Sequence, residues 1–426
     1  SAQRGRSCRA ALGAERHPNA YERKEPLVHL RVAQTWPPAW WKHAFLGAVD
    51  LLGRPLSSVW RLGTARQVHA EPQRILVVEL WQIGDVVLAT PFLSALRRCF
   101  PQAQISLLGK PHADVLLRAS GLVDEVIVAC LPWTRTQRKY NPADYDWRGL
   151  RKLVRALRER RFDLAFDARM DLRSNILVAL SGARRRVGFG YGGGDWLLTD
   201  AVPVDPKANH KVEDWLALMR AVGCGSLEEQ RCVLTTTEAE RTAARALLAG
   251  HFGIVRQPIA LHPGGSHAGK RWPIERFTSL AQDLVAAGHQ VVVLEEPSGY
   301  GEALRKVKGI LPVRVGLREM MAMIEQCATL VCNDSGPMHV AAALGVPTVA
   351  IFERGQPKWF GPVGKAHIVI EGELSGVDVS AAPIDRPPPK PVPIERVQQA
   401  VLGQIEGQKA TRHWSLRPGE SGSFSP

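Results

Sequence analysis

The stretch Thr329–Pro347, TLVCNDSGPMHVAAALGVP, contains the features that decide the fold. It begins with an apolar run around Val331 that is typical of a buried parallel strand, and it ends in an Ala-rich segment that favours a helix. Between them, Asp334 and Ser335 are common N-cap residues, and Pro337 suits the first helical turn. Free N–H groups at such a helix start attract anions. The stretch predicts an anion-binding strand-to-helix junction, although a well-capped connection without a ligand explains it equally well.

Strand-to-helix alternation continues on both sides of this stretch. From Arg74 onward, apolar runs alternate with segments of helical period, which predicts an α/β fold with parallel sheets and right-handed crossovers. We expect two Rossmann-like, doubly wound domains, 74–235 and 236–405, that face each other across a central cleft. Residues 1–73 form a basic, Trp-rich extension, and 406–426 a polar tail after a last helix.

Positive charge is concentrated in the first half of the chain. The net charge of the 426 residues is +14, and residues 131–161 hold ten basic against three acidic side chains. Such an excess indicates an acidic glycolipid, a membrane surface or nucleic acid as partner. A solvated helix face is the alternative explanation. Because no nucleic-acid-binding motif occurs, we expect no nucleic acid partner.

Cysteine usage and hydropathy bear on the compartment. The seven cysteines form no C-x-x-C pair, which predicts reduced, mostly buried thiols in a cytoplasmic protein. No run of eighteen apolar residues and no signal-peptide core occur. Residues 36–62 instead predict a basic, Trp-rich amphipathic helix, which can lie in a membrane interface. The alternative is that this helix packs on the protein's own body.

A single carboxylate follows the first predicted strand, Arg74–Leu80. Asp85 stands after Gly84, where the first domain presents the carboxyl edge of its sheet. It suits a general base, and it equally suits the cap of the predicted helix Val86–Cys99. The junction lacks G-x-G-x-x-G, so a dinucleotide cofactor is not supported.

A second anion site is predicted in the second domain. The strand ending at His262 runs into a Gly-containing loop that includes Ser266, and Lys270 follows. Glycines let a phosphate approach the backbone, and a lysine supplies a point charge. The loop is not a Walker motif. A surface loop with a solvated lysine remains the alternative.

Taken together, these segments resemble glycosyltransferase family 9, the heptosyltransferases of lipopolysaccharide core assembly. The resemblance spans Arg74 to Ile405 and depends on an ordered set of motifs. These are Gly84-Asp85 with Pro91, Leu172-Arg173, Arg185-Arg186-Val187-Gly188-Phe189, His262-Pro263-Gly264, Lys270-Arg271-Trp272-Pro273 and Asn333-Asp334-Ser335-Gly336-Pro337-Met338-His339.

The resemblance implies a GT-B enzyme with an N-terminal acceptor domain and a C-terminal nucleotide-sugar domain. It implies transfer of a heptose from ADP-heptose to a sugar hydroxyl of the lipopolysaccharide inner core, with inversion and without a metal or other cofactor. The acceptor would be an acidic glycolipid, lipid A-core, and the enzyme would be cytoplasmic, with possible peripheral contact to the inner membrane.

Residue roles follow from the same resemblance. Asp85 would be the general base, and Lys270 would neutralise the leaving diphosphate. The other donor-binding residues would be Ser266, Asp334, Ser335, Gly336 and His339. We expect the acceptor to contact the basic residues Arg135, Arg138, Lys139 and Arg173.

The chain departs from the family pattern at two carboxylates that we expect near the nucleotide pocket, Glu296 and Glu353. Glu296 is a candidate to accept hydrogen bonds from ribose hydroxyls, as acidic residues do in dinucleotide folds. Equally, the donor can differ from ADP-heptose. Two alternatives therefore stay open: a GT-B transferase with another nucleotide sugar, and a basic nucleic-acid- or membrane-binding scaffold with a GT-B body.

Overall fold

The computed structural model describes Asp50, Leu51, Gly53 and residues 71–134, 145–205, 208–224, 231–376 and 390–415. Most of the predicted helix at 36–62 lies outside these ranges. In the part that is described, Asp50 Oδ1 accepts a hydrogen bond of 2.7 Å from the Gly194 N–H. That contact, together with the close packing of Gly53 on Trp196, ties the described part of the extension to the protein's own body.

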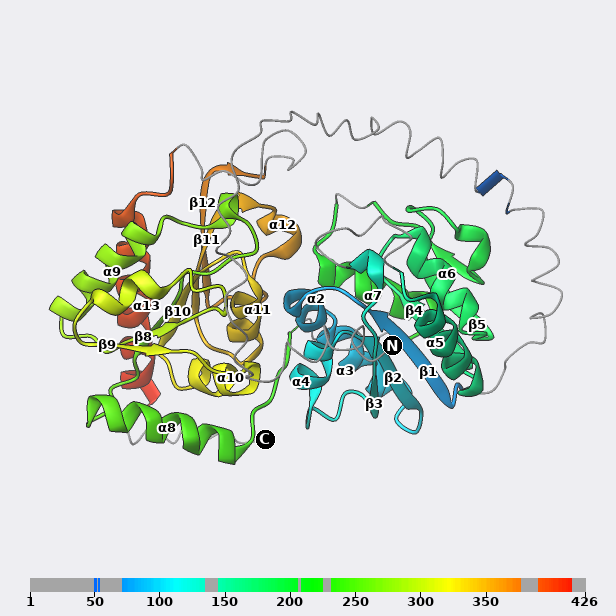
Figure 1. The fold of residues 1–426 in the computed structure, drawn as a ribbon, viewed down its shortest axis with the longest axis horizontal. Coiled ribbons are helices and arrows are strands. Elements are labelled where there is room, and N and C mark those ends of the chain that lie inside the picture. Colours follow the sequence, from blue (N-terminus) through cyan, green and yellow to red (C-terminus); the bar gives the residue numbers. More distant parts are fainter. Residues whose placement is uncertain are drawn as a thin grey trace, which may run out of the picture.

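The first half of the chain folds around one six-stranded parallel sheet, which we call the front lobe (Figure 1). Its strands follow the order β3-β2-β1-β4-β5-β6, the Rossmann order, with a topological switch point between β1 and β4. The strands are β1 (Arg74–Glu79), β2 (Gln104–Gly109), β3 (Glu125–Val128), β4 (Leu164–Asp167), β5 (Arg185–Phe189) and β6 (Asp200–Val202). The helices are α2 (Ile83–Leu88), α3 (Thr90–Cys99), α4 (Pro111–Leu117), α5 (Trp147–Glu159), α6 (Leu172–Leu180) and α7 (Lys211–Ala221).

The second half repeats the plan and forms the rear lobe. Its six parallel strands have the order β12-β11-β10-β7-β8-β9, so the switch point lies between β7 and β10. The strands are β7 (Ile259–His262), β8 (Val291–Leu294), β9 (Ile310–Val313), β10 (Thr329–Asn333), β11 (Thr348–Gly355) and β12 (His367–Ser375). The helices are α8 (Glu238–Phe252), α9 (Ile274–Ala286), α10 (Leu317–Glu325), α11 (Gly336–Ala343), α12 (Pro357–Phe360) and α13 (Ile394–Ser415).

Both sheets are buried on both faces, which explains their continuous apolar strands. In β1, RILVVE, every residue after Arg74 is buried, and all five residues of β10 are buried. In the front lobe, Phe92 of α3 packs on Phe166 of β4 and on Trp215 of α7, with ring centroids 5.1 and 4.7 Å apart. The two-domain GT-B fold that we predicted is confirmed.

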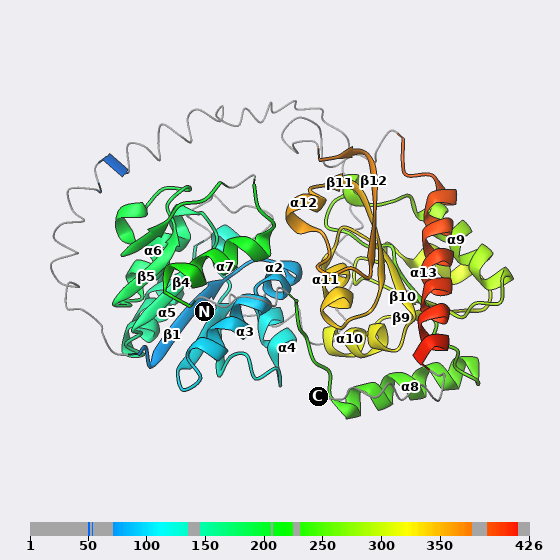
Figure 2. The same ribbon diagram turned by 180° about the vertical axis from the view of Figure 1, so that it is seen from behind.

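The two lobes meet where α2 and α11 begin (Figures 1 and 2). A Cβ on Gly84 would lie 2.5 Å from His339 Cδ2, and one on Gly336 would lie 3.0 Å from Ile83 Cβ. Only glycine permits this approach at Gly84, since real Cβ contacts are longer. Because α2 follows β1 and α11 follows β10, the carboxyl ends of the two sheets face each other.

A side chain of the front lobe also bonds to the rear lobe. His210, the N-cap of α7, accepts the Val212 N–H at Nδ1, and its Nε2 lies 3.1 Å from the Gly361 carbonyl oxygen. An acceptor at Nδ1 places the proton on Nε2, which donates across the gap. Burial lowers the pKa of His210, so the neutral ring that this arrangement needs is favoured.

Three sequence predictions are corrected by the structure. The predicted helix Val86–Cys99 is two helices, because Pro91 has no N–H for the Val87 carbonyl, which accepts the Thr90 hydroxyl at 2.7 Å instead. Helix α13 continues to Ser415, past the predicted start of a polar tail.

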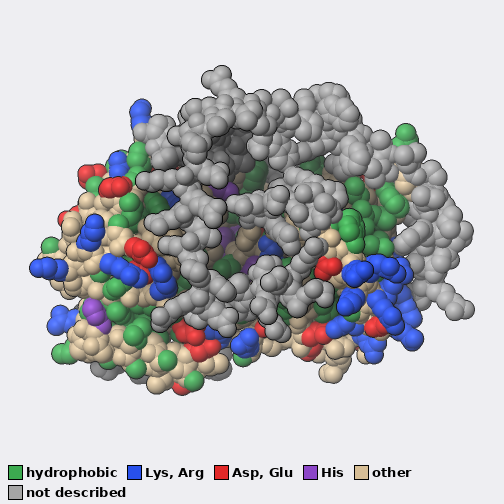
Figure 3. Space-filling view, in the orientation of Figure 1, with side chains coloured by type: hydrophobic (Ala, Val, Ile, Leu, Met, Phe, Trp, Pro, Cys, Tyr) green, Lys and Arg blue, Asp and Glu red, His purple; other side chains and the backbone are tan. Residues whose placement is uncertain are grey.

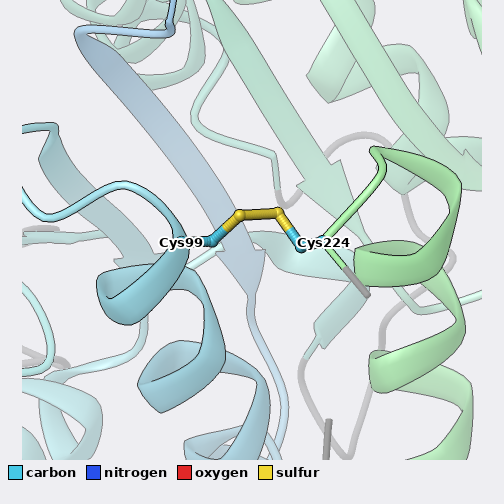
Figure 4. Close-up of a disulfide and its surroundings, with 2 residues drawn as sticks. All are labelled: Cys99 and Cys224. Atoms are coloured by element: carbon cyan, nitrogen blue, oxygen red, sulfur yellow. A yellow bond between two sulfur atoms is a disulfide. The ribbon is translucent and has the colours of Figure 1, made fainter. Parts of the chain in front are cut away.

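The third correction concerns the thiols. Cys99, at the end of α3, and Cys224, after α7, form a disulfide (Figure 4). Cys232, Cys327 and Cys332 are free and buried, as expected. The sequence contains no signal for the pair, because the two residues stand 125 positions apart and meet only through the packing of α3 on α7.

Candidate functional site

Several of the predicted site residues gather at the two switch points. Asp85 follows β1, and the loop after β4 lies beside it. In the rear lobe, the His262 end of β7 lies beside Asp334 and Ser335, which follow β10. Ligands of open α/β sheets bind at this position, where neighbouring loops diverge to opposite faces.

Asp85 occupies the third position of α2, and both of its predicted roles are compatible with that place. Its Oδ2 accepts the Gln82 N–H at 3.0 Å and closes a capping box. Its Oδ1 accepts from Arg169 Nη1 at 3.1 Å. The side chain of Asp85 keeps 19% of its surface exposed, so one carboxylate both caps the helix and reaches the open edge of the lobe.

Two further carboxyls lie behind Asp85 at the ends of neighbouring strands. Glu79 ends β1, Asp167 ends β4, and both are buried. Burial, followed by repulsion from Asp85, raises the pKa of Glu79 to about 8. Burial, followed by repulsion from Asp171, raises the pKa of Asp167 to about 8. Both groups are therefore mostly neutral at pH 7.

The predicted cation of the rear lobe is held in place by an acid. Lys270 Nζ donates to Asp334 Oδ2 at 2.6 Å, with 24% of the lysine side chain and 8% of the aspartate side chain exposed. Asn333 fixes the loops on both sides, because its amide donates to the Pro263 and Gly264 carbonyls and its oxygen accepts the Trp272 N–H. The structure thus brings Lys270 and Asp334 together as one charged pair.

Ser335 is the N-cap residue of α11, but its hydroxyl does not cap the helix. The hydroxyl lies 3.2 Å from the Asn333 carbonyl oxygen and 3.4 Å from His262 Nδ1. Burial lowers the pKa of His262 to about 4, so this imidazole is neutral. In the first turn of α11, Pro337 has no N–H and the Met338 N–H donates to the Ser335 carbonyl oxygen at 3.1 Å. The Gly336 N–H is therefore the donor left for the anion that we predicted.

Gly336 and His339 lie where the lobes touch. Burial lowers the pKa of His339 to about 4, and the charges that act on the ring include those of Asp334, Asp85 and Lys270. His339 is therefore close enough to both lobes for the charged pair of one and the acid of the other to act on its ring. Its Nδ1 is buried without a hydrogen-bond partner among the described residues.

The other two residues predicted to bind the donor, Ser266 and Glu296, lie at the edge of the candidate site. Ser266 is exposed. Glu296 packs against Gly264, lies 4.0 Å from His262 Nε2 and accepts from the Ser298 hydroxyl at 2.9 Å. Its place beside the anion loop suits the predicted contact with ribose.

Glu353 does not lie at an open nucleotide pocket, so that expectation is wrong. It is fully buried, and its Oε1 accepts the Val392 N–H at 2.8 Å. Burial raises the pKa of Glu353 to about 7. The carboxyl anchors the chain segment that enters α13.

Of the predicted acceptor-binding residues, Arg135, Arg138 and Lys139 lie outside the described residues. Arg173, near the start of α6, donates to Asp171, its Nε lying 2.9 Å from Oδ1. That bond lowers the pKa of Asp171, against the effect of burial. Contact between Arg173 and an acceptor stays a prediction.

Sequence reasoning missed Arg169, the partner of Asp85. Besides its ion pair, its guanidinium carbon lies 3.8 Å from the centroid of the Trp81 ring. Arg169 and Asp85 line one cavity together with Glu79, Leu88, Ala168, Lys211 and Trp215. The sequence did contain one signal for Arg169, its position two residues after a buried strand. This position points to the site only once β4 is known to pair with β1.

Two absences hold for the described residues. No group of three or more His, Cys, Asp or Glu side chains among them is arranged to hold a metal ion. No described helix combines the length and apolar character of a membrane span.

Comparisons with known proteins agree with the geometry. The sequence profile of glycosyltransferase family 9 (heptosyltransferase) matches residues 150–379. The chain is 26% identical to lipopolysaccharide heptosyltransferase 2 of Escherichia coli K12, over 70% of this chain and 87% of that one. It is 21% identical to the lipopolysaccharide core heptosyltransferase OpsX of Haemophilus influenzae, over 70% and 84%.

A solved structure shows the same fold. The structure of E. coli ADP-heptose lipopolysaccharide heptosyltransferase II superposes with a TM-score of 0.62 at 23% identity, covering 79% of this chain and 99% of that one. Since the family profile matches more than half of the sequence, the chain belongs to glycosyltransferase family 9, the heptosyltransferases.

Proposed function

We propose that this heptosyltransferase moves the heptose of ADP-heptose to a sugar hydroxyl of the lipopolysaccharide inner core, with inversion and without a metal. The relatives' names support the heptose and the core acceptor. The solved E. coli enzyme is named an ADP-heptose heptosyltransferase, which supports the ADP-linked donor. Family membership also favours an enzyme over a nucleic-acid- or membrane-binding scaffold.

The donor is proposed to bind the rear lobe, with its diphosphate at the start of α11. Departure of ADP develops negative charge, which the helix N-terminus and Lys270 are placed to stabilise. Asp334 already fixes the position of the Lys270 ammonium, so the side chain needs to move little when the diphosphate binds. This arrangement supplies the charge that a divalent cation would otherwise provide. Glu296 is proposed to accept from the ribose.

The acceptor is proposed to bind the front lobe, with its hydroxyl at Asp85. The main support for this proposal is the contact between Gly84 and His339, which brings the start of α2 opposite the start of α11. A base on one lobe and a leaving group on the other lie on opposite sides of the transferred sugar. Direct displacement in that geometry inverts the anomeric centre, and Asp85 takes the proton from the attacking hydroxyl.

A transfer assay with ADP-heptose and a lipopolysaccharide core acceptor tests the role of Asp85. We expect Asp85→Asn to lower kcat by roughly 10² or more, since it keeps the shape of the side chain and removes the base. The control is Asp114→Asn, an exposed aspartate of α4 paired with Arg118. Near-normal turnover by Asp85→Asn would remove that role.

The identity of the donor is tested separately. We expect ADP-heptose to raise the melting temperature more than UDP- or GDP-linked sugars do. Stabilisation by a UDP-sugar alone would favour the alternative, a GT-B transferase with a different nucleotide sugar.

We further propose that the acceptor is an acidic glycolipid reached from the cytoplasmic face of the inner membrane. The support is a stripe of exposed cations on α5, spaced three or four residues apart so that they share one face. This basic stripe is Arg148, Arg151, Lys152, Arg155 and Arg158. Figure 3 shows Lys and Arg side chains gathered at this edge of the front lobe.

The disulfide Cys99–Cys224 weighs against a cytoplasmic location, because disulfides are rare there.

A further inference from the structure

Arg169 holds the proposed base in place through an ion pair. Its Nη1 donates to Asp85 Oδ1 at 3.1 Å, and its guanidinium stacks on Trp81 at 3.8 Å. One-third of its side chain is exposed, compared with 19% for Asp85. Arg169 is therefore the more accessible member of the pair.

The guanidinium keeps capacity for a second anion. An arginine has five N–H donors in a planar fork, and within the described residues Arg169 uses one nitrogen, on Asp85. The neighbouring cations are engaged. Lys211, which lines the same cavity, donates to Asp214 at 2.6 Å, and Arg173 donates to Asp171. Each of these three cations is paired with a carboxylate, and Arg169 is the one whose partner is the proposed base, to which it gives one of its five N–H donors.

The backbone beside Arg169 is held in an uncommon conformation. Met170 has φ of 52°, in the left-handed region that residues other than glycine rarely adopt. Gly192 packs so closely on this loop that a Cβ there would lie 1.8 Å from the Met170 carbonyl oxygen. A strained residue fixed by its surroundings is typical of functional sites. The loop aims Arg169 across the end of β4 toward Asp85.

An ion pair with arginine ties up the oxygen that has to receive a proton. The same fork binds a carboxylate or a phosphate in a bidentate manner, with stronger bonds than it makes through one nitrogen. An anionic group on the acceptor would therefore draw Arg169 away from Asp85. That exchange would bind the acceptor at Arg169 and release the carboxylate of Asp85 in a single step.

We propose that Arg169 determines the specificity for the acceptor. Its guanidinium binds an anionic group, a carboxylate or a phosphate, next to the accepting hydroxyl, and in doing so gives up its ion pair with Asp85. This inference rests on the proposed function. It makes the activity of the base depend on an acidic acceptor, so a neutral sugar that enters the cavity leaves Asp85 paired.

The test compares two synthetic acceptors that differ in one charge, a glycan with a free carboxylate beside the accepting hydroxyl and its methyl ester. For the wild type we expect kcat/KM for the ester to be lower by roughly tenfold to a hundredfold, the range of one charge-assisted interaction. For Arg169→Gln we expect the two acceptors to react within about threefold of each other, and the ester to react at or above the wild-type rate for the ester, because Asp85 is no longer paired with an arginine. Arg169→Lys, which keeps the charge but not the fork, is expected to restore part of the preference.

The matched control is Arg220→Gln, on the surface of α7 and paired with Glu213; it should keep the wild-type preference. The rise in melting temperature on adding ADP shows whether each variant is folded, since the proposed donor site lies in the other lobe. Should Arg169→Gln misfold, Arg169→Lys decides alone. An unchanged preference in the folded variants would overturn the role of Arg169, whereas failure of the wild type to transfer heptose to either acceptor would overturn the proposed function.

Discussion

At the scale of single residues, the site consists of charges that are paired before any ligand arrives. Lys270 lies on Asp334, and Arg169 lies on Asp85. Each pair holds one functional group in a defined place and leaves it partly exposed. In the mechanism that we propose, ligand binding is an exchange of partners, in which the anion of a substrate replaces a carboxylate of the protein.

Asp167 provides a prediction about pH and stability. Its pKa is about 8 in the folded protein and 3.8 in the unfolded chain, so unfolding releases a proton between these values. The native state binds more protons there, and the stability of the wild type falls as pH rises from about 4 to about 8. We expect Asp167→Asn, which cannot ionise, to be near neutral at about pH 4 and stabilising by on the order of 2–4 kcal/mol at pH 8.5. Urea unfolding at the two pH values measures the difference, and an equal effect at both would contradict the burial argument.

Sequence reasoning singled out candidate site residues whose type is tied to a local motif. Asp85, Lys270, Asp334 and Ser335 each stand at a recognisable strand-to-helix junction. Arg169 was missed because its meaning depends on a neighbour 84 positions away. Glu353 was misplaced for the reverse reason, since a residue after a strand can point into the interior as well as toward a ligand.

At the scale of elements, the central strands that we predicted are present. The strands that we did not predict lie at the edges of the two sheets. β6, β9 and β12 were not predicted, and each is the outermost strand of its sheet on one side. β6 has three residues, and β9 contains Pro312, which is tolerated at an edge. Strand signals are weakest there, because an edge strand needs fewer buried residues and fewer paired N–H groups.

The disulfide between α3 and α7 gives the second prediction. It closes a loop of 125 residues, so it should restrict the unfolded chain. We expect Cys99→Ser with Cys224→Ser to lower the free energy of unfolding by about 2–4 kcal/mol in oxidising buffer. With a reducing agent, the wild type should lose most of this advantage. An unfolding midpoint of the wild type that does not respond to the reductant would show that the two thiols are not joined in solution.

At the scale of the whole molecule, the front lobe carries the basic stripe on α5 and the rear lobe carries the proposed donor site. This division suits an enzyme that takes one substrate from an anionic surface and the other from solution. The basic stripe on α5 is the feature of the front lobe that tests it, because its side chains are exposed along one face of the helix.

We expect a triple change on the stripe, Arg151→Gln, Lys152→Gln and Arg155→Gln, to weaken binding to vesicles with anionic lipid by roughly a hundredfold, at about 1 kcal/mol per charge. The control changes three exposed cations of the rear lobe, Arg256, Lys306 and Lys308, to Gln. Equal vesicle binding by the two variants, or binding that does not weaken with salt, would separate the stripe from the membrane.

The central claim is that Asp85 and Lys270 face one another across the contact of α2 with α11. A crystal structure of Asp85→Asn with ADP-heptose tests it most directly. We predict the diphosphate at the start of α11, with Lys270 Nζ about 3 Å from one of its oxygens, and residue 85 on the opposite side of the heptose. A diphosphate bound elsewhere, or a heptose whose anomeric carbon faces away from residue 85, would contradict it.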